Sequence, residues 1–308
     1  SVGFNIQQNI GLDRQNINTI FNYRWKPKKT RTNQIDLVNV QFVKNLNPEN
    51  YYNVYTSSYT RLNQIAIETG FDFEDDTEPL NLSIPDETEK FIQQVIDGDS
   101  NLDISEEQEQ EVSEIRERQI RLSENNLIVA TNYTWTRDTR ENINDNNFSH
   151  FTTRVVSSGT FTNLVFQNKN ELGQRTFLDV PVAQYFKVEF EYKKYWELRD
   201  QNILVFRTFV GAAIPYGNSS NVPFSRSYSA GGSNEMRAWR TFDLGPGGEL
   251  NNLEYKVGTF KVIGNIEYRF KLTNKFNSAL FIDACNIWDI TDSNLITEEG
   301  KFTSLSSL

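Results

Sequence analysis

The chain has 308 residues, of which 37% are hydrophobic and 13% aromatic, and its formal net charge is −10. One cysteine, Cys285, and one histidine, His150, exclude an intrachain disulfide, a cysteine metal cluster and a zinc site built on two or three histidines. No run of about 18 apolar residues occurs, which excludes a transmembrane helix but not a transmembrane β-barrel, whose strands alternate in polarity.

Residues 1–45 are predicted to form β-strands. Between residues 16 and 26 the even positions are mostly Asn, Arg and Lys, whereas the odd positions are Ile17, Thr19, Phe21, Tyr23 and Trp25. This period of two is typical of a strand with one apolar and one polar face. A loop is expected at 27–30, and residues 35–43 repeat the pattern less regularly.

Residues 46–123 differ in charge and in period. The part from 71 to 123 holds 17 acidic and 4 basic residues, so it carries a net charge of −13 and the rest of the chain carries +3. Helices are predicted at 51–67, from Pro85 onward and at 106–120. We interpret the segment as an acidic, partly helical insertion; the alternative is a solvated loop without a partner. The absence of a broad basic stripe argues against nucleic acid as a partner.

Strands are predicted again within 124–308, at 124–139, 147–166, 185–195, 202–214, 264–272 and 278–288. A long loop rich in Gly, Ser and Asn separates two of them at about 216–256. Several strands reach roughly 10 residues, the length that a tilted strand needs to cross a bilayer. Strand length and aromatic content therefore favour a transmembrane antiparallel β-barrel over a soluble sandwich, although both architectures alternate.

No set of side chains in the sequence indicates an enzyme or a cofactor site. His150 stands alone beside a strand, and Cys285 is expected to be a small packing residue. The segment 245–248 lacks the Lys-Ser/Thr pair and the strand-to-helix setting of a phosphate-binding loop. We therefore expect no catalytic residue, no metal and no cofactor.

Three segments in the last third of the chain resemble the BamA/TamA family of outer-membrane β-barrel assembly proteins. They are the loop from Phe224 to Gly248, the strand at 264–270 and the strand at 281–289. In that family a Gly-Gly loop ending in Val-Arg-Gly-aromatic folds back into the barrel lumen. The matching loop residues here are Gly231, Gly232, Met236, Arg237, Ala238, Trp239, Gly245, Pro246 and Gly247. Ala238 replaces a family glycine, and Cys285 also stands where the family usually has glycine.

The resemblance implies a structural contact between Arg237 and two carboxylates, Glu267 and Asp283. Both acidic residues alternate with apolar neighbours, so they are expected on the lumen face. A guanidinium can bind carboxylates in a bidentate geometry, and removing it from a buried cluster would cost about 3–5 kcal/mol. We therefore expect these three residues to lock the loop to the barrel lumen.

The resemblance also implies that the chain is part of a larger barrel. The family barrel has sixteen strands, and the order of the motifs indicates that this chain covers about the fifth to the thirteenth. The chain opens directly in alternating sequence, so a processed or interior start is expected, without the periplasmic POTRA domains. Such a fragment should not insert stably alone, because an open sheet edge in lipid leaves backbone groups unpaired.

The expected function is to assist insertion, assembly or translocation of outer-membrane proteins in the bacterial outer membrane. Residues 116–127 are similar to the TamL-like branch, the TamA-like lipoproteins of Bacteroidetes. The partners implied are outer-membrane lipids, unfolded outer-membrane protein clients and a TamB-like protein. Two alternatives remain open, a two-partner-secretion-type export pore and a soluble β-sandwich binding module. By family topology, the acidic insertion is expected on the extracellular side.

Overall fold

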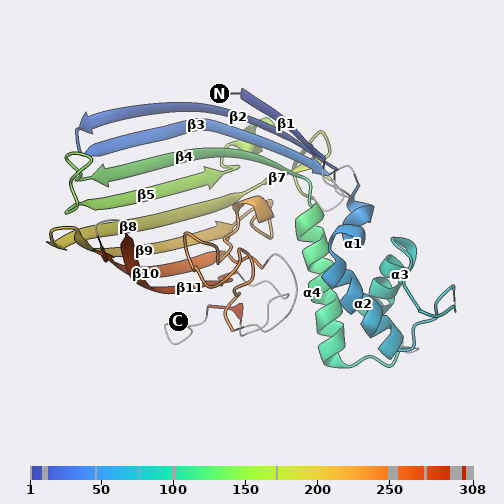
Figure 1. Ribbon diagram of the computed structural model, residues 1–308. Coiled ribbons are helices and arrows are strands. Elements are labelled where there is room, and N and C mark those ends of the chain that lie inside the picture. Colours follow the sequence, from blue (N-terminus) through green and yellow to red (C-terminus); the bar gives the residue numbers. More distant parts are fainter. Residues whose placement is uncertain are drawn as a thin grey trace.

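Nine long strands form one antiparallel sheet in the computed structural model, which describes residues 2–8, 13–45, 47–75, 77–98, 102–170, 173–248, 256–273, 276–291 and 300–302. Figure 1 shows the sheet as a curved wall with most helices gathered at one end. In spatial order the strands are β1 (Val2–Gln8), β2 (Asp13–Lys28), β3 (Arg31–Asn45), β4 (Asn126–Asp138), β5 (Ser149–Ser158), β8 (Tyr185–Arg199), β9 (Asn202–Pro215), β10 (Phe260–Lys271) and β11 (Asn277–Trp288). Over the described residues the sheet is not closed, since β1 and β11 are its edges.

The connections at the two ends of the sheet differ in length. At one end, short turns join β2 to β3, β8 to β9 and β10 to β11, and a somewhat longer loop joins β4 to β5. At the other end lie three long connections, which run from β3 to β4, from β5 to β8 and from β9 to β10. The chain therefore has a turn end and a long-connection end, an asymmetry typical of outer-membrane barrels.

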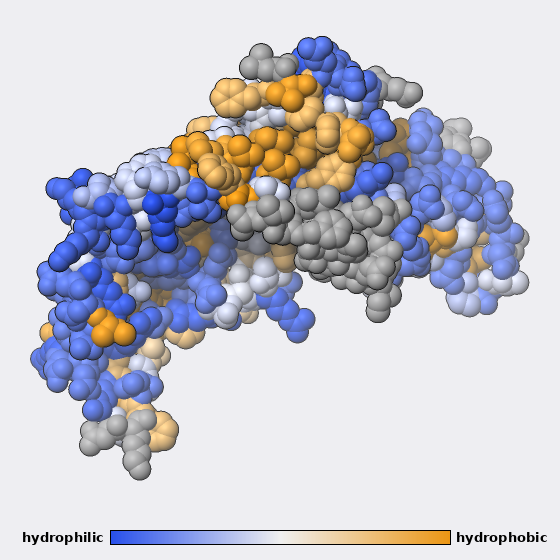
Figure 2. Space-filling model, turned by 90° about the horizontal axis from the view of Figure 1, so that it is seen from above, coloured by the Kyte–Doolittle hydropathy of each residue, from blue (hydrophilic) through white to orange (hydrophobic). Residues whose placement is uncertain are grey.

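The two faces of the sheet differ in polarity. Large apolar side chains are exposed on one face, which we call the outer face; they include Phe21, Tyr23, Phe190, Ile266 and Ile282. Figure 2 shows a hydrophobic band across this face, with hydrophilic residues at both ends. The opposite, inner face carries charged residues, which alternate with apolar ones along β8, β9 and β10. This single sheet does not fit the sandwich alternative, which requires two facing sheets.

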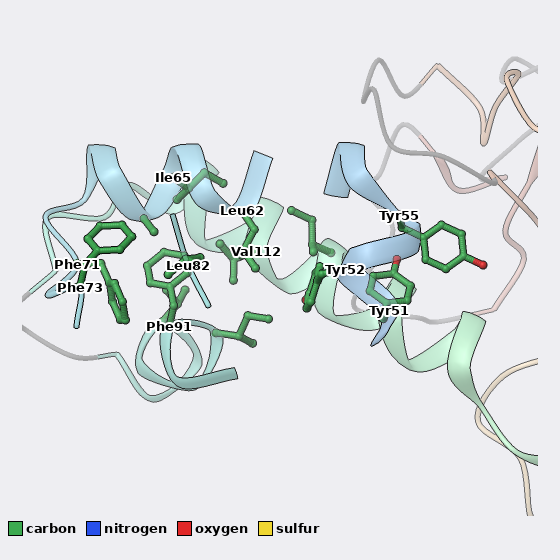
Figure 3. Packing of buried hydrophobic residues seen from close by; sticks show 14 of the residues in the cluster. Tyr51, Tyr52, Tyr55, Leu62, Ile65, Phe71, Phe73, Leu82, Phe91 and Val112 are labelled. Atoms are coloured by element: carbon green, nitrogen blue, oxygen red, sulfur yellow. The ribbon is translucent and has the colours of Figure 1, made fainter. Parts of the chain in front are cut away.

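The segment between β3 and β4 is helical and has a hydrophobic core of its own. It contains η1 (Pro48–Asn50), α1 (Tyr51–Val54), α2 (Thr56–Glu68), α3 (Asp86–Asp97) and α4 (Glu106–Ser123). The apolar sides of these helices face one another (Figure 3), and fully buried members of the core include Tyr51, Leu62, Ile65, Phe91, Val112 and Ile115. A solvated loop would have no such core. None of the helices among the described residues is long and apolar enough to cross a membrane.

Local chemistry explains where the helices begin and end. The Ser105 side chain accepts a hydrogen bond from the backbone N–H of Gln108, whose side chain in turn accepts one from the N–H of Ser105. This capping box starts α4. Helix α3 has three acidic residues in its first turn and ends at Gly98, whose φ of +71° suits glycine.

The prediction of one strand over 147–166 is wrong in its second half. Strand β5 ends at Ser158, because Gly159 has a φ of +74° and turns the chain. Residues 162–165 then form the short helix α5 (Thr162–Val165). The hairpin of β6 (Thr176–Phe177) and β7 (Val180–Ala183), absent from the prediction, follows, and β7 pairs with β4 in parallel.

Candidate functional site

The described part of the connection from β9 to β10, residues 216–248 and 256–259, lies against the inner face of the sheet, and we call it the inner loop. Figure 1 shows its coils in front of β9, β10 and β11. Isolated bridges join Tyr228 to Gly258 and Ala230 to Leu244, so the loop is folded on itself. Part of the loop side that faces the sheet is apolar. Tyr228 and Ala230 of the loop form a buried hydrophobic cluster with residues of the sheet, among them Ile128, Ala213 and Ile287.

Two consecutive glycines set the turn that presents the arginine. Gly231 and Gly232 have φ values of +102° and +95°. A Cβ on Gly231 would lie 2.0 Å from the Arg240 carbonyl oxygen, a distance that no side chain can occupy. The N–H of Gly232 donates to the Trp239 carbonyl at 2.8 Å, which closes the tip of the loop around residues 233–238.

The structure brings Arg237, Glu267 and Asp283 together on the inner face. Arg237 Nε donates to Asp283 Oδ2 at 2.8 Å, and Nη2 donates to Asp283 Oδ1 at 2.9 Å. Arg237 Nη1 donates to Glu267 Oε2 at 3.0 Å. The guanidinium also stacks on Phe281, with Cζ 3.5 Å from the ring centroid. One arginine therefore joins the loop to both β10 and β11.

The two carboxylates differ in how much they depend on Arg237. The Asp283 side chain is only 5% exposed, and its other partners are the Asn265 side-chain amide and the Arg237 backbone N–H. Glu267 has a second cation, because Arg269 Nε donates to its Oε1 at 2.6 Å. Hydrogen bonding to Asp283, and next to Glu267, raises the pKa of Arg237 above its usual value, so the guanidinium stays charged.

Other strand cations bind the backbone of the inner loop, and none of these contacts was predicted from the sequence. Lys261 Nζ donates to the Ser229 carbonyl and to Glu235 Oε2, both at 2.5 Å. Arg207 Nη1 donates to the Asn234 carbonyl at 2.6 Å, and Lys187 Nζ donates to the Arg226 carbonyl at 2.9 Å. Alternation along the strands predicts that one strand face is polar, but backbone acceptors in a loop have no sequence signal.

The remaining motif residues differ in what they contact. The N–H of Met236 donates to the Gly232 carbonyl at 3.1 Å, while Trp239 is exposed. Gly247 N–H donates to the Ile287 carbonyl at 2.7 Å, which ties the Gly245-Pro246-Gly247 segment to β11. The backbone of Ala238 does not have a positive φ, and its side chain is exposed. Alanine therefore fits this position without backbone strain.

A cavity of about 480 Å³ lies beside the Arg237 cluster. It is lined by both loop and strand residues, among them Lys193, Arg207, Glu235, Arg237, Glu267 and Arg269. Both signs of charge are present in its wall. The cluster is therefore partly open to water, which weakens its ion pairs relative to a fully buried site.

Among the described residues, contacts between the helical segment and the rest of the chain lie at the inner loop, at Asp289 and at the junction with the sheet. Phe224 of the inner loop packs against the helical core, and Arg121 Nη2 of α4 lies 3.8 Å from the buried Asp289 Oδ2. At the junction with the sheet, the Asn45 N–H donates to Asn125 Oδ1 at 2.6 Å, and the Asn45 side chain donates to the carbonyls of Ser123 and Glu124. Burial raises the pKa of Glu124 at this junction to about 7, although Arg121 opposes the shift.

His150 and Cys285 lie outside the Arg237 cluster. His150 Nδ1 is 3.3 Å from Asp138 Oδ2, and its Nε2 is 3.1 Å from Thr152 Oγ1, at the turn end of the sheet. Cys285 is half-buried and packs against the hydrophobic cluster that contains Tyr228 and Ala230 of the inner loop. Within the part of the chain that the structure describes, no group of three His, Cys, Asp or Glu side chains is placed to hold a metal ion.

Comparison with solved structures identifies the architecture. The chain is similar to BamA from Haemophilus ducreyi lacking POTRA domains 1–3, with a TM-score of 0.50 and 12% sequence identity. The match covers 91% of this chain and 43% of that one, so the chain spans less than half the length of the matched protein. At this identity the likeness shows the fold alone. A search of curated proteins gives no match.

The family assignment comes from the sequence model of the Omp85 superfamily domain, which matches residues 3–305. This range contains the sheet, the helical segment and the inner loop. Members of the superfamily are outer-membrane assembly or transport proteins and not enzymes. The chain therefore belongs to the Omp85 superfamily.

Proposed function

We propose that this chain is the barrel part of a protein that assists the insertion and assembly of other outer-membrane proteins in the bacterial outer membrane. The superfamily assignment, the strands of 12 residues or more such as β8 and β10, and the apolar outer face support this proposal. Alternating strands with an apolar exterior and a polar interior suit a bilayer-spanning wall.

The observation that carries the structural part of the proposal is the contact of Arg237 with Asp283 and Glu267. A bidentate arginine fixes both position and orientation, unlike a lysine at the same place. The inner loop would thereby hold β10 and β11 in register while the barrel handles a client chain. We name this role the Arg237 lock.

Finer assignments rest on the resemblance of residues 116–127, which lie in α4 and at the start of β4, to TamL-like proteins. On this basis the partners are outer-membrane lipids, unfolded outer-membrane protein clients and a TamB-like protein. The helical segment lies at the long-connection end, and long connections of such barrels are extracellular. We therefore place its acidic surface outside the cell. The energy for insertion would come from burial of the client in lipid, without a nucleotide.

The test is a charge reversal, Arg237→Glu, in the intact protein produced in its own bacterium. The matched control is Arg240→Glu, the same change at an exposed arginine in the same loop. We expect the first variant, but not the second, to lower the amount of folded outer-membrane proteins and to slow growth. Normal client levels with Arg237→Glu would refute the lock. Normal client levels after depletion of the whole protein would refute the assembly function itself.

A further inference from the structure

The described part of the connection between β5 and β8, residues 159–170 and 173–184, covers part of the outer face of the sheet. Its strand β7 pairs with the first residues of β4, Leu127 with Val182 and Ile128 with Ala183. The buried residues Leu127, Val180 and Val182 form a cluster. Val40, Phe42, Val129 and Phe166 pack against it.

Register shows that this cluster lies outside the wall. Along β4, Ile128 and Ala130 pack with Tyr228 of the inner loop, so the even positions face inward. Leu127 and Val129 must then face outward. Leu127 is nevertheless only 3% exposed, because the connection covers it.

The covering segment hides apolar side chains of the sheet but presents apolar side chains of its own. It exposes four large apolar side chains, Phe161 (68%), Val165 (69%), Phe177 (42%) and Leu178 (71%). The Phe177 ring also contacts Phe166, with centroids 5.2 Å apart, so it is continuous with the covered cluster. A segment facing bulk water would be expected to present polar side chains at such positions.

The tip of the β6–β7 hairpin is the clearest case. Leu178 and Asp179 have φ values of +50° and +63°, and the left-handed region is rarely occupied by leucine. Glycine or asparagine would form the same turn with less strain. A leucine that is both strained and exposed indicates that its apolar side chain contacts something outside the chain.

The position of the connection along the strands indicates which layer of the bilayer it contacts. On β3, Phe42 of the covered cluster lies four residues beyond the exposed Val38, toward the long-connection end. Phe42 is also only three residues from Asn45, the last residue of β3, which is roughly 10 Å at about 3.3 Å per residue. The connection therefore lies near the edge of the band, where amphipathic and aromatic residues meet the lipid headgroups.

We propose that the β5–β8 connection is an anchor in the interfacial layer of the bilayer, with Phe161, Val165, Phe177 and Leu178 inserted among the lipids. The inference rests on the proposed outer-membrane location. It adds a lipid contact made by a folded connection and not by the strands.

The test is a spin-labelling experiment, and this chain has one cysteine, Cys285, that must first be removed. In a Cys285→Ala background, Leu178→Cys carries a nitroxide label in the intact protein, reconstituted in phosphatidylcholine vesicles. The label's collisions with oxygen, which partitions into lipid, are compared with those of a water-soluble nickel chelate. Phe190→Cys, on the exposed apolar row of β8, is the lipid control. Ile143→Cys, 82% exposed in the β4–β5 loop, is the water control.

We expect nickel collisions at position 178 to be several-fold fewer than at 143, with oxygen collisions between those of the two controls. Nickel access at 178 equal to that at 143, with 190 protected, would overturn the anchor and leave the membrane location intact. Shielding of 178 from both reagents would mean a protein partner and would also overturn it. Free nickel access at 190 as well would refute the outer-membrane location.

Discussion

Replacing Arg237 with alanine should release the inner loop from the wall, and the structure sets the size of the effect. Glu267 keeps Arg269 as its cation, so only Asp283 loses its charged partner. Breaking a buried ion pair costs about 3–5 kcal/mol, and the adjoining open cavity places this case at the lower end, about 3 kcal/mol. Since 1.4 kcal/mol is a factor of ten, the released state should become over a hundred times more populated.

The measurement is the temperature at which the folded band converts to the unfolded band in mild-detergent gels, together with protease cleavage within residues 216–248. Arg269→Ala is the matched control, because this arginine contacts Glu267 but is about half exposed. The double variant Arg237→Ala/Asp283→Ala should be less destabilised than the two single changes predict together. If Arg237→Ala resists heat and protease as well as Arg269→Ala does, the reasoning is refuted.

Three further outcomes follow from local geometry. Gly231→Ala should disorder the inner loop because its Cβ would meet the Arg240 carbonyl at 2.0 Å, whereas Gly248→Ala, with nothing within 4 Å, should be neutral in the same protease assay. Leu62→Ala should destabilise the helical segment by about 2–5 kcal/mol, measured by thermal loss of helical circular dichroism, while the gel shift of the barrel stays unchanged. Glu124 has a pKa of about 7 in the folded protein, against an ordinary value of 4.5. Its contribution to stability is therefore greatest below pH 4.5 and is lost as the pH rises through 7. Glu124→Gln should raise the melting temperature at pH 8 and leave it unchanged near pH 4.

The long strands could be predicted from the sequence, because apolar and polar residues alternate along each of them over many positions. The alternation in β8 and β10 extends along the whole strand, so chance matches are few. Helices within residues 46–123 were also predicted, from apolar spacing and from the helix start at Pro85, whereas the capping box of α4 was not. The short elements β6, β7 and α5 were missed, because two to four residues carry no period.

Within the site, the meeting of Arg237 with Glu267 and Asp283 came from the resemblance and not from composition. Side chains that bind loop carbonyls, such as Lys261 and Arg207, could not be predicted, since any carbonyl is an equivalent acceptor in sequence. The raised pKa of Glu124 likewise depends on burial at a junction between two elements distant in the chain. These features arise from tertiary packing alone.

The junction at Asn45 and Asn125 has a consequence for how the wall assembles. These residues are 80 positions apart, yet a hydrogen bond of 2.6 Å joins them. An unfolded connection of that length would impose a large loop-closure entropy on the pairing of β3 with β4. A segment that folds first on its own core brings its two ends together in advance. To the growing sheet it then behaves as a tight hairpin turn, so its folding rate, more than its length, should govern when β3 and β4 join.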